Sequence, residues 1–336
     1  MDHSTVYAGI DYANSFVQVC VLDAAGRQIG NRRCPNDWRK IADYVRPFGS
    51  RVRASIEACT GASCLAEELL QHASWSIDLA HPGYVERMKR NPDKTDFTDA
   101  RMLADLVRVG YLPRVWLAPP HIRELRRLVR YRQDLVDRRR SLKLRAGALL
   151  RDLRVTPPPC RPWTQRWRRW VAGVELPEQS RWILDRTLED LADVERRVAI
   201  AERRLADVTE NDVFVRQMCQ IPGIGVVTAC VLRAEIGDIR RFRNGKQLGR
   251  FCGLSPCNAS SGTRQADAGL ISACNRQLRA TLMEAAHRLK RFDPRWRTLA
   301  DHMRSRGKPG SVIAAAVANR WIRGLFHDLM SISTAA

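Results

Sequence analysis

Four carboxylates in the first third of the chain stand where acidic side chains can act together. Asp11 follows the apolar run 6–10, and Glu57 follows a second run, 52–56. Asp96 and Asp99 are three residues apart at the start of an expected helix, so they share one face of it. Carboxylates that converge at strand ends and a helix start can hold two Mg²⁺ ions, which activate a nucleophile and stabilise a leaving oxygen in phosphodiester chemistry. Asp93 and Asp105 are nearby alternatives, and any single acid at a strand end can be an ordinary polar terminus.

A candidate nucleophile lies much later in the chain. Ser260 and Ser261 precede Gly262 within residues 249–275, a segment rich in Gly, Ser and Asn that we expect to be mainly loop. A serine in such a loop near Arg264 can attack phosphorus while a carboxylate or a metal takes its proton. An ordinary turn explains the same residues, and chemistry alone favours that interpretation.

An α/β region has to position the acids. Residues 5–23 alternate apolar with polar side chains, which predicts two strands joined by a turn at 13–15. Further strands are expected at 27–34, 52–58 and 75–80, and helices at 37–48, 62–73 and 99–109. Strands that alternate with helices indicate an α/β domain over residues 1–112.

The composition changes after residue 112. Residues 121–154 hold 12 Lys and Arg against four acids, with apolar residues at spacings of three, four and seven, which predicts one long amphipathic helix of the coiled-coil type. A second such helix at 178–208 would form an antiparallel pair with it, or an arm that meets another subunit. The basic face either is solvated surface or binds phosphates through Arg126, Arg130, Arg138, Arg139, Arg140 and Lys143.

Three tryptophans lie among arginines between these two helices. Trp163, Trp167 and Trp170 recur at spacings of four and three, which predicts that they share one helical face. This stripe either packs on the long helices or forms a nucleic-acid surface in which Arg pairs with phosphate and Trp stacks on an unpaired base, and the two interpretations are compatible. The arginines of that surface would be Arg166, Arg168 and Arg169.

A glycine-containing turn opens the last part of the chain. Residues 221–225, Ile-Pro-Gly-Ile-Gly, separate helical patterns at 213–220 and 226–236 and resemble a helix-hairpin-helix turn. Gly223 and Gly225 permit a tight turn, and the N–H groups that start the next helix can face a phosphate. A plain connection between helices is the alternative. Residues 211–336 as a whole are expected to be mostly helical.

Overall composition narrows the class of protein. Lys and Arg number 57 against 36 Asp and Glu, a formal charge of +21, so nucleic acid is the expected partner. A hydrophobic content of 45% argues against disorder. The chain has no apolar run of about 18 residues and no signal-like start, so we expect a cytoplasmic protein without a membrane partner. The ten cysteines lack zinc-ribbon spacing and are expected to be reduced thiols that pack as small core residues.

Seven motifs, taken in order, carry a family resemblance. GIDYAN, SIEACTG, NPDKTDFTDARMLA, IPGIG, GLSP, SSG and NRQLRATL resemble the DEDD-type transposases, the bridge-RNA-guided recombinases of compact bacterial insertion sequences, which are related to Piv-type DNA invertases. The resemblance spans nearly the whole chain. It implies a RuvC-like (RNase H-like) domain over residues 1–112, a coiled-coil middle over 113–210 and a mostly helical C-terminal transposase domain over 211–336.

The resemblance also assigns roles to residues. It implies that the Mg²⁺-binding carboxylates are Asp11, Glu57, Asp96 and Asp99. It matches Ser261 to the family's nucleophile, with Ser260 as the alternative one residue away. It implies that this serine attacks the DNA backbone to give a phosphoserine link and a free 3′-hydroxyl, and that strands exchange through a Holliday-junction-like intermediate. Residues 272–275, Ser-Ala-Cys-Asn, depart from the family's Ser-Lys-x-Gly segment, which leaves the phosphate contacts of that loop open.

The expected partners follow from the same resemblance. A guide (bridge) RNA would pair with donor and target DNA, and homodimers would join into homotetramers at the bacterial nucleoid. Three competing functions stay open: a RuvC-like metal-dependent nuclease or Holliday-junction resolvase that uses water, a site-specific invertase that uses no RNA, and a nucleic-acid-binding protein without catalysis.

Overall fold

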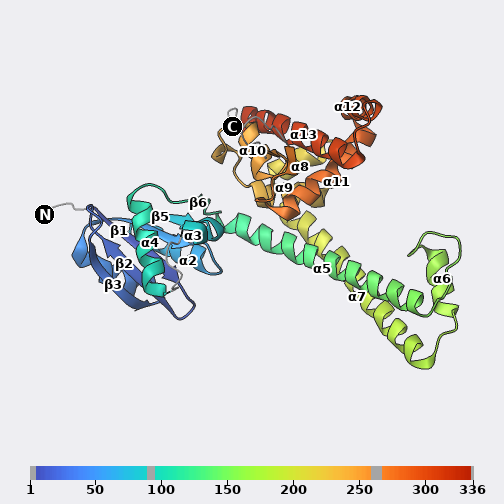
Figure 1. The fold of residues 1–336 in the computed structure, drawn as a ribbon, viewed down its shortest axis with the longest axis horizontal. Helices are drawn as coiled ribbons and strands as arrows, with labels where there is room; N and C mark the ends of the chain where they lie inside the picture. The colour runs from blue at the N-terminus through green and yellow to red at the C-terminus, as the bar shows by residue number, and fades with distance from the viewer. Residues whose placement is uncertain (1–4, 89–94, 259–266, 334–336) are drawn as a thin grey trace. The chain divides into compact units, whose positions relative to one another are not determined.

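The computed structural model describes residues 5–88, 95–258 and 267–333. The chain divides into two compact units, Met1–Ala118 and Pro119–Ala336. The first unit is α/β and the second is mostly helical, as expected from the sequence (Figure 1).

A mixed sheet forms the centre of the first unit. Among the described residues its order is β3-β2-β1-β4-β5-β6, in which β1 pairs antiparallel with β2 and parallel with β4. The remaining pairs are antiparallel for β2–β3 and β5–β6 and parallel for β4–β5. The strands are β1 (Thr5–Tyr12), β2 (Phe16–Leu22), β3 (Gln28–Pro35), β4 (Arg51–Glu57), β5 (Ser76–Ala80) and β6 (Arg114–Val115). All strands expected from the alternating patterns are present, and only the two-residue β6 was not expected.

Helices cover both faces of this sheet (Figure 1). On one face Val6, Ala8 and Ile10 pack with side chains of α1 (Trp38–Val45) and α2 (Ala62–His72) in one apolar core. The alternate residues of β1 and β2 meet α4 (Asp96–Arg108) on the other face. Burial of each large aliphatic side chain contributes about 1.5–3 kcal/mol, so this two-sided core holds the strand ends in place. The short helices η1 (Arg46–Phe48) and α3 (Pro82–Met88) complete the unit.

Two long helices dominate the second unit. They are α5 (Pro120–Asp152) and α7 (Glu178–Thr209), which lie side by side with the short α6 (Gln165–Gly173) at one end (Figure 1). Leu150 packs with Leu184 at that end, while Leu135 and Leu142 pack with Val194 and Val198 further along. Residue numbers that rise in α5 as they fall in α7 define an antiparallel pair, as the heptad-like spacing predicted.

A cluster of helices closes the other end of the pair. Leu125 and Val129 of α5 and Leu205 of α7 share a core with these helices. They are α8 (Val213–Cys219), α9 (Val226–Ile236), η2 (Ile239–Arg241), α10 (Gly245–Phe251), α11 (Arg276–Phe292), α12 (Pro294–Ser305) and α13 (Gly310–Ser333). The segment expected to be mainly loop also contains a short hairpin, β7 (Pro256–Asn258) and β8 (Asp267–Leu270).

The structure tests two expectations that were drawn from the composition. All ten cysteines are free, and four are buried: Cys20, Cys34, Cys230 and Cys252. The interpretation as core residues is wrong for the three exposed ones, Cys59, Cys64 and Cys219. Among the described residues, no helix is both long enough and apolar enough to cross a membrane.

Candidate active site and nucleic-acid interface

Asp11 and Glu57 lie at neighbouring positions on one face of the sheet. In the parallel pair of β1 and β4, Gly9 is opposite Ser55 and Ile10 is opposite Ile56, so the next residue of each strand carries one of the two acids. Side chains alternate between faces, and Gly9 and Ser55 both contact α4. Two residues further along, Asp11 and Glu57 therefore lie on the face that α4 covers.

Helix α4 crosses this face at close range. A Cβ atom added to Gly9 would lie 2.0 Å from the carbonyl oxygen of Ala100, and the Ser55 hydroxyl donates to the carbonyl oxygen of Leu103 at 2.8 Å. Thr95 begins the helix, because its hydroxyl accepts a hydrogen bond from the N–H of Thr98 at 3.2 Å. The helix thus starts at Asp96, three residues before the expected start, and both acids lie in its first turn.

The direction in which Asp99 faces follows from the rest of α4. Arg108 donates to the carbonyl oxygen of Ala24 at 3.4 Å. Ala24 belongs to the turn between β2 and β3, and this turn lies near the N-terminal end of β1 because β1 and β2 are antiparallel. Nine residues are two and a half helical turns, so Asp99 is on the opposite flank of α4 from Arg108. This position favours a direction of the Asp99 side chain toward the C-terminal ends of β1 and β4, and the residue is only 7% exposed. Asp96, in contrast, is exposed.

Electrostatics agrees with this placement of Asp11 and Glu57. Partial burial raises the pKa of the Cys59 thiol and a backbone hydrogen bond from Ala62 lowers it, while the carboxylates of Glu57 and Asp11 both raise it. Both acids must therefore lie near this thiol. Of the two rival acids, Asp105 accepts from Arg108 at 2.9 Å on the far flank of α4, and Asp93 lies outside the described residues.

The donor chemistry fits a divalent cation. Asp11, Glu57 and Asp99 offer carboxylate oxygens at one end of one sheet face, and Mg²⁺ prefers oxygen ligands. Within the part of the chain that the structure describes, no three His, Cys, Asp or Glu side chains form a metal-binding cluster. Mg²⁺ is usually bound by one or two carboxylates together with waters and substrate phosphates, so these residues suit such a site without forming a closed cage.

The candidate nucleophile lies outside the described residues. Ser260, Ser261 and Arg264 all fall between β7 and β8. These two strands pair, with Pro256 opposite Leu270. The serine segment therefore begins and ends within the second unit.

A groove of about 1100 Å³ lies within the second unit, between α5 and the helices after α7. Gly223 and Gly225 line it together with Arg139 and Arg140 of the basic helix. Three arginines that the sequence interpretation did not single out also line it: Arg132, Arg276 and Arg288. The signal for the last two is their spacing on α11, because residues 276, 277, 280, 281, 284 and 288 form one small and polar helical face.

The turn at Gly223 is held from α11. Arg288 donates to the carbonyl oxygen of Gly223 at 2.8 Å and to the Thr228 hydroxyl at 2.9 Å. Gly223 has a φ of +89°, and a Cβ there would lie 3.1 Å from Arg288, so glycine suits this position. Gly225 precedes α9, and no described side chain caps the first turn of that helix. The first residues of α9 line the groove, and N–H groups at the start of a helix can donate to a phosphate.

The basic face of α5 is not uniform. Arg126 was expected to bind phosphate, and this is wrong in the present fold, because its guanidinium donates to the carbonyl oxygen of Ala234 at 2.7 Å and its side chain is only 21% exposed. Arg130 is 60% exposed and lies 3.5 Å from Glu235. Arg138 and Arg140 are exposed, and Arg139 is half-buried.

The tryptophan segment also departs from the expected single helical face. Trp163 precedes α6 and has a φ of +69°, so it is not on the helix that carries Trp167 and Trp170. Trp167 is 3% exposed and packs with Leu150 and Leu184, which confirms the packing interpretation for this residue. Its burial contradicts a direct role in binding nucleic acid.

The arginines around these tryptophans differ in exposure and in ion pairing. Arg166 and Arg169 are exposed. Arg168 pairs with Glu195 of α7 at 2.9 Å, and Lys143 of α5 pairs with the same carboxylate at 3.2 Å. These two cations therefore already join α6 and α5 to α7.

An acid-bearing α/β unit followed by a strongly basic helical unit is the arrangement of a protein that acts on nucleic acid. Comparison with known proteins defines the family. The DEDD transposase model of the IS110 type matches residues 8–154, a range that holds all four acids. The model described as "Transposase IS116/IS110/IS902 family" matches residues 215–301, a range that holds the glycine turn and both serines. The chain belongs to the IS110/IS116/IS902 family of transposases, which confirms the resemblance drawn from the motifs.

Individual relatives agree with this assignment. A probable family 20 transposase of Pseudomonas aeruginosa is 26% identical over 327 residues, which cover 95% of each chain. The transposase for insertion sequence element IS1111A of Coxiella burnetii is 26% identical and covers 84% of this chain and 77% of its own. An uncharacterised 43.6 kDa protein of insertion element IS110 from Streptomyces coelicolor is 24% identical and covers 96% of this chain and 94% of its own.

Proposed function

We propose that this transposase is an RNA-guided DNA recombinase that cleaves and rejoins strands through a covalent phosphoserine at Ser261, assisted by Mg²⁺ at Asp11, Glu57, Asp96 and Asp99. The observation that carries the proposal is the placement of Asp11, Glu57 and Asp99 at one end of one sheet face. The mixed sheet with α4 across it supports the RuvC-like assignment of this domain. We keep three functional parts for the chain, residues 1–112, 113–210 and 211–336.

The acids have distinct tasks in this proposal. Asp11 and Glu57 project from strands that are buried on both faces, so their positions are rigid, and Asp99 approaches them from α4. Mg²⁺, when bound, supplies positive charge that stabilises the phosphate and the leaving oxygen. Asp96 is exposed and would complete the set from the first turn of the same helix.

The covalent step is written for Ser261. Its hydroxyl oxygen forms a bond to phosphorus while a carboxylate takes its proton, and the bond from phosphorus to the 3′ oxygen breaks. The 3′ oxygen gains a proton and leaves as a free hydroxyl. A 3′-hydroxyl from another strand then attacks the phosphoserine, which restores the serine and joins the new strand.

The second unit would hold the nucleic acids. Its groove combines arginines from α5 and α11 with the first residues of α9, which suit phosphates without reading base sequence, although Asp137, Glu202 and Glu284 also line it. This is what a protein needs when a guide RNA selects donor and target DNA by base pairing. We further propose homodimers that join into homotetramers through the α5–α7 pair, acting on DNA at the nucleoid in the bacterial cytoplasm.

Trapping the adduct tests the nucleophile. The serine keeps the fragment that carries the 5′ phosphate, so DNA labelled at the 3′ end of the cleaved strand is incubated with protein and guide RNA, and denaturing gels measure label that remains bound to protein. We expect Ser261→Ala to abolish both the adduct and cleavage, and Ser260→Ala to keep both. Loss of the adduct only in Ser260→Ala would move the nucleophile by one residue. Cleavage at the wild-type rate by Ser261→Ala would instead favour the nuclease that uses water.

Two further measurements distinguish recombination from simple binding, and RNA guidance from its absence. Asp11→Asn should reduce recombination sharply while binding to DNA persists, and no effect on any DNA reaction would support a protein that only binds nucleic acid. RNA that copurifies with the wild-type protein and is required for adduct formation supports guidance. Full recombination by RNA-free protein would favour an invertase that needs no RNA.

A further inference from the structure

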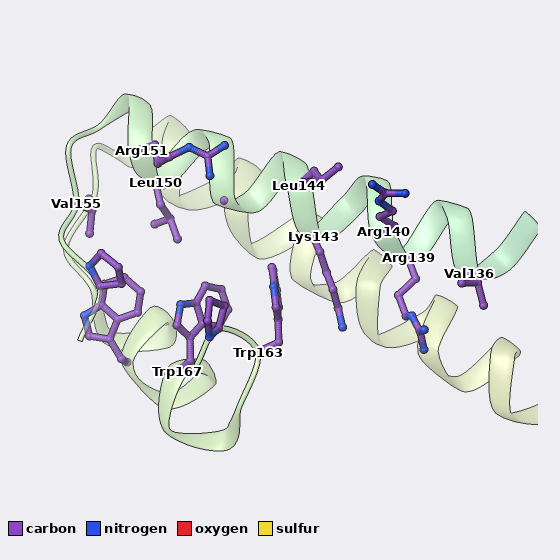
Figure 2. Close-up of a pocket in the computed structure, with 14 residues that line it drawn as sticks. Val136, Arg139, Arg140, Lys143, Leu144, Leu150, Arg151, Val155, Trp163 and Trp167 are labelled. Atoms are coloured by element: carbon purple, nitrogen blue, oxygen red, sulfur yellow. The ribbon is translucent and has the colours of Figure 1, made fainter. Parts of the chain in front are cut away.

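A cavity of about 620 Å³ lies at the α6 end of the long helix pair, between α5 and the segment that leads into α6 (Figure 2). Four cationic side chains line it, and the described lining contains no acid; the cations are Arg139, Arg140, Lys143 and Arg151. Trp163, Trp167 and Trp170 form much of its apolar wall. Lys143 pairs with Glu195 of α7, so the cavity combines aromatic surface with the positive charge of Arg139, Arg140 and Arg151.

The three indoles have different positions in this cavity. Trp167 is 3% exposed and belongs to the core between α5, α6 and α7, so it forms the base. The ring centroid of Trp163 lies 4.3 Å from that of Trp167, and the ring centroid of Trp170 lies 5.9 Å from that of Trp167. Both are half-buried, so each has ring surface that the core does not cover.

The backbone at Trp163 is strained. A tryptophan with a φ of +69° lies in the left-handed region, which is unfavourable for a residue that is not glycine. The Lys143 ammonium, 5.3 Å from the Trp163 ring centroid, and Arg168, which donates to the Trp163 carbonyl oxygen at 3.4 Å, both favour this conformation. Lys143 extends beside this ring in Figure 2. Trp163 packs partly against the core of the long helix pair, and it also lines the cavity.

We propose that this cavity binds one unpaired base of a nucleic-acid strand, stacked on Trp163, with the flanking phosphates on Arg139, Arg140 and Arg151. The inference rests on the proposed function only in requiring that the protein binds nucleic acid. A cavity of this size suits a small planar group. A base within a duplex stays in its stack, so the occupant is a bulged, looped or single-stranded nucleotide.

Charge separates this occupant from an apolar side chain of a second copy of the chain. A nucleotide brings a phosphate whose negative charge can pair with Arg139, Arg140 and Arg151, whereas an apolar side chain of a second copy brings no charge to these cations. Stacking of a base on an aromatic ring tolerates any base, which fits a cavity whose polar lining consists of cations that bind phosphate.

Binding of short hairpins to the full-length protein tests the proposal. The probes are labelled hairpins with a one-nucleotide bulge, paired with identical hairpins in which the bulged nucleotide is abasic, and fluorescence anisotropy measures both. RNA and DNA versions form two arms that identify the source of the base. We expect removal of the base to weaken binding by roughly 5- to 150-fold in at least one arm, the range for one stacked base.

Variants of the wall make the test specific. Trp163→Gly removes the ring, and glycine suits a φ of +69°, so the fold should persist while the protein binds base-containing and abasic probes equally. Trp163→Asn is a second variant, because asparagine also tolerates this region. Trp182→Ala is the matched control, since Trp182 is 62% exposed on α7 and does not line the cavity. Arg151→Gln should weaken both probes, and Arg145→Gln on the exposed side of α5 should weaken them less.

Three outcomes would overturn the proposal. The first is equal binding of both probes by the wild-type protein in both arms. The second is unchanged discrimination in folded Trp163→Gly and Trp163→Asn. The third is a change of oligomeric state in these variants with no change in probe binding, which would assign the cavity to a second copy of the chain. The same binding measurements can be made with Ser261→Ala protein, which we expect to form no adduct. A negative result for the cavity is therefore independent of the result of the adduct test.

Discussion

Replacement of Gly9 by alanine tests whether the position of α4 controls the acidic site. The new Cβ would lie 2.0 Å from the carbonyl oxygen of Ala100 and 2.3 Å from the amide nitrogen of Ala104, whereas ordinary contact begins at 3.4 Å. Both neighbours are helix backbone, which cannot rotate away as a side chain can. Helix α4 must therefore move away from β1 by roughly 1 Å or more.

The size of the effect follows from this displacement. Overpacking of this kind costs about 1–3 kcal/mol of the free energy of unfolding. Asp99 moves with α4, while Asp11 and Glu57 stay with the sheet, and a misplacement of about 1 Å in a catalytic group can reduce a rate roughly 100-fold. We expect Gly9→Ala to lower adduct formation by about that factor although every carboxylate is retained.

The assay compares two glycines of the same unit. Gly83 in α3 is the matched control, because a Cβ there would lie 3.5 Å from the His81 ring, which is ordinary contact. Single-turnover adduct formation and urea unfolding are measured for both variants, together with duplex binding, which we propose depends on the second unit. Wild-type rate and stability in Gly9→Ala would refute the close approach of α4 to β1, and equal losses in Gly83→Ala would show that the effect is not specific.

The remaining predictions concern single contacts. Thr95→Ala removes the cap of α4 and should cost about 1 kcal/mol in urea unfolding, with a lower rate of adduct formation because Asp96 and Asp99 lie in the turn that frays. Glu235, 3% exposed, accepts from Asn275 at 2.7 Å and lies near Arg126 and Arg130, so Glu235→Ala should lower stability by about 3–5 kcal/mol in the same assay. Partial burial raises the pKa of Glu195, but hydrogen bonds from Arg168 and Lys143 outweigh it and hold the pKa below the ordinary value of 4.5. The stability from Glu195 is therefore present above pH 4.5 and lost as pH falls through the lower folded-state pKa, and a pH series of unfolding midpoints should be flatter for Glu195→Gln. If Arg138, Arg139 and Arg140 bind duplex phosphates, their joint change to Gln should reduce the log–log salt slope of DNA affinity by about 0.9 per lost contact, and an unchanged slope would assign these arginines to solvated surface.

Local patterns in the sequence were sufficient for most of the fold. The alternation of apolar and polar side chains in residues 5–23 predicts β1 and β2. Most residues of the two strands taken together are buried, and the less buried positions include Asp11. Heptad-like spacing predicts α5 and α7, because the apolar residues at that spacing form the buried face of each helix. The spacing of Trp163 and Trp167 misleads, because a step of four residues suits a helix but does not require one, and only the φ of Trp163 excludes it from α6.

The sequence by itself determined the elements, the acids at strand ends and the family, because these depend on periodicity and on short motifs read along the chain. Only the tertiary structure decided which arginines are available, since Arg126 and Arg140 belong to the same helix but face a carbonyl oxygen and solvent respectively. It likewise decided how closely α4 approaches β1, through the absence of a side chain at Gly9 and the hydrogen bond from Arg108 to Ala24. Such facts depend on how distant segments pack, and no local pattern records the side of a helix on which its partner will lie.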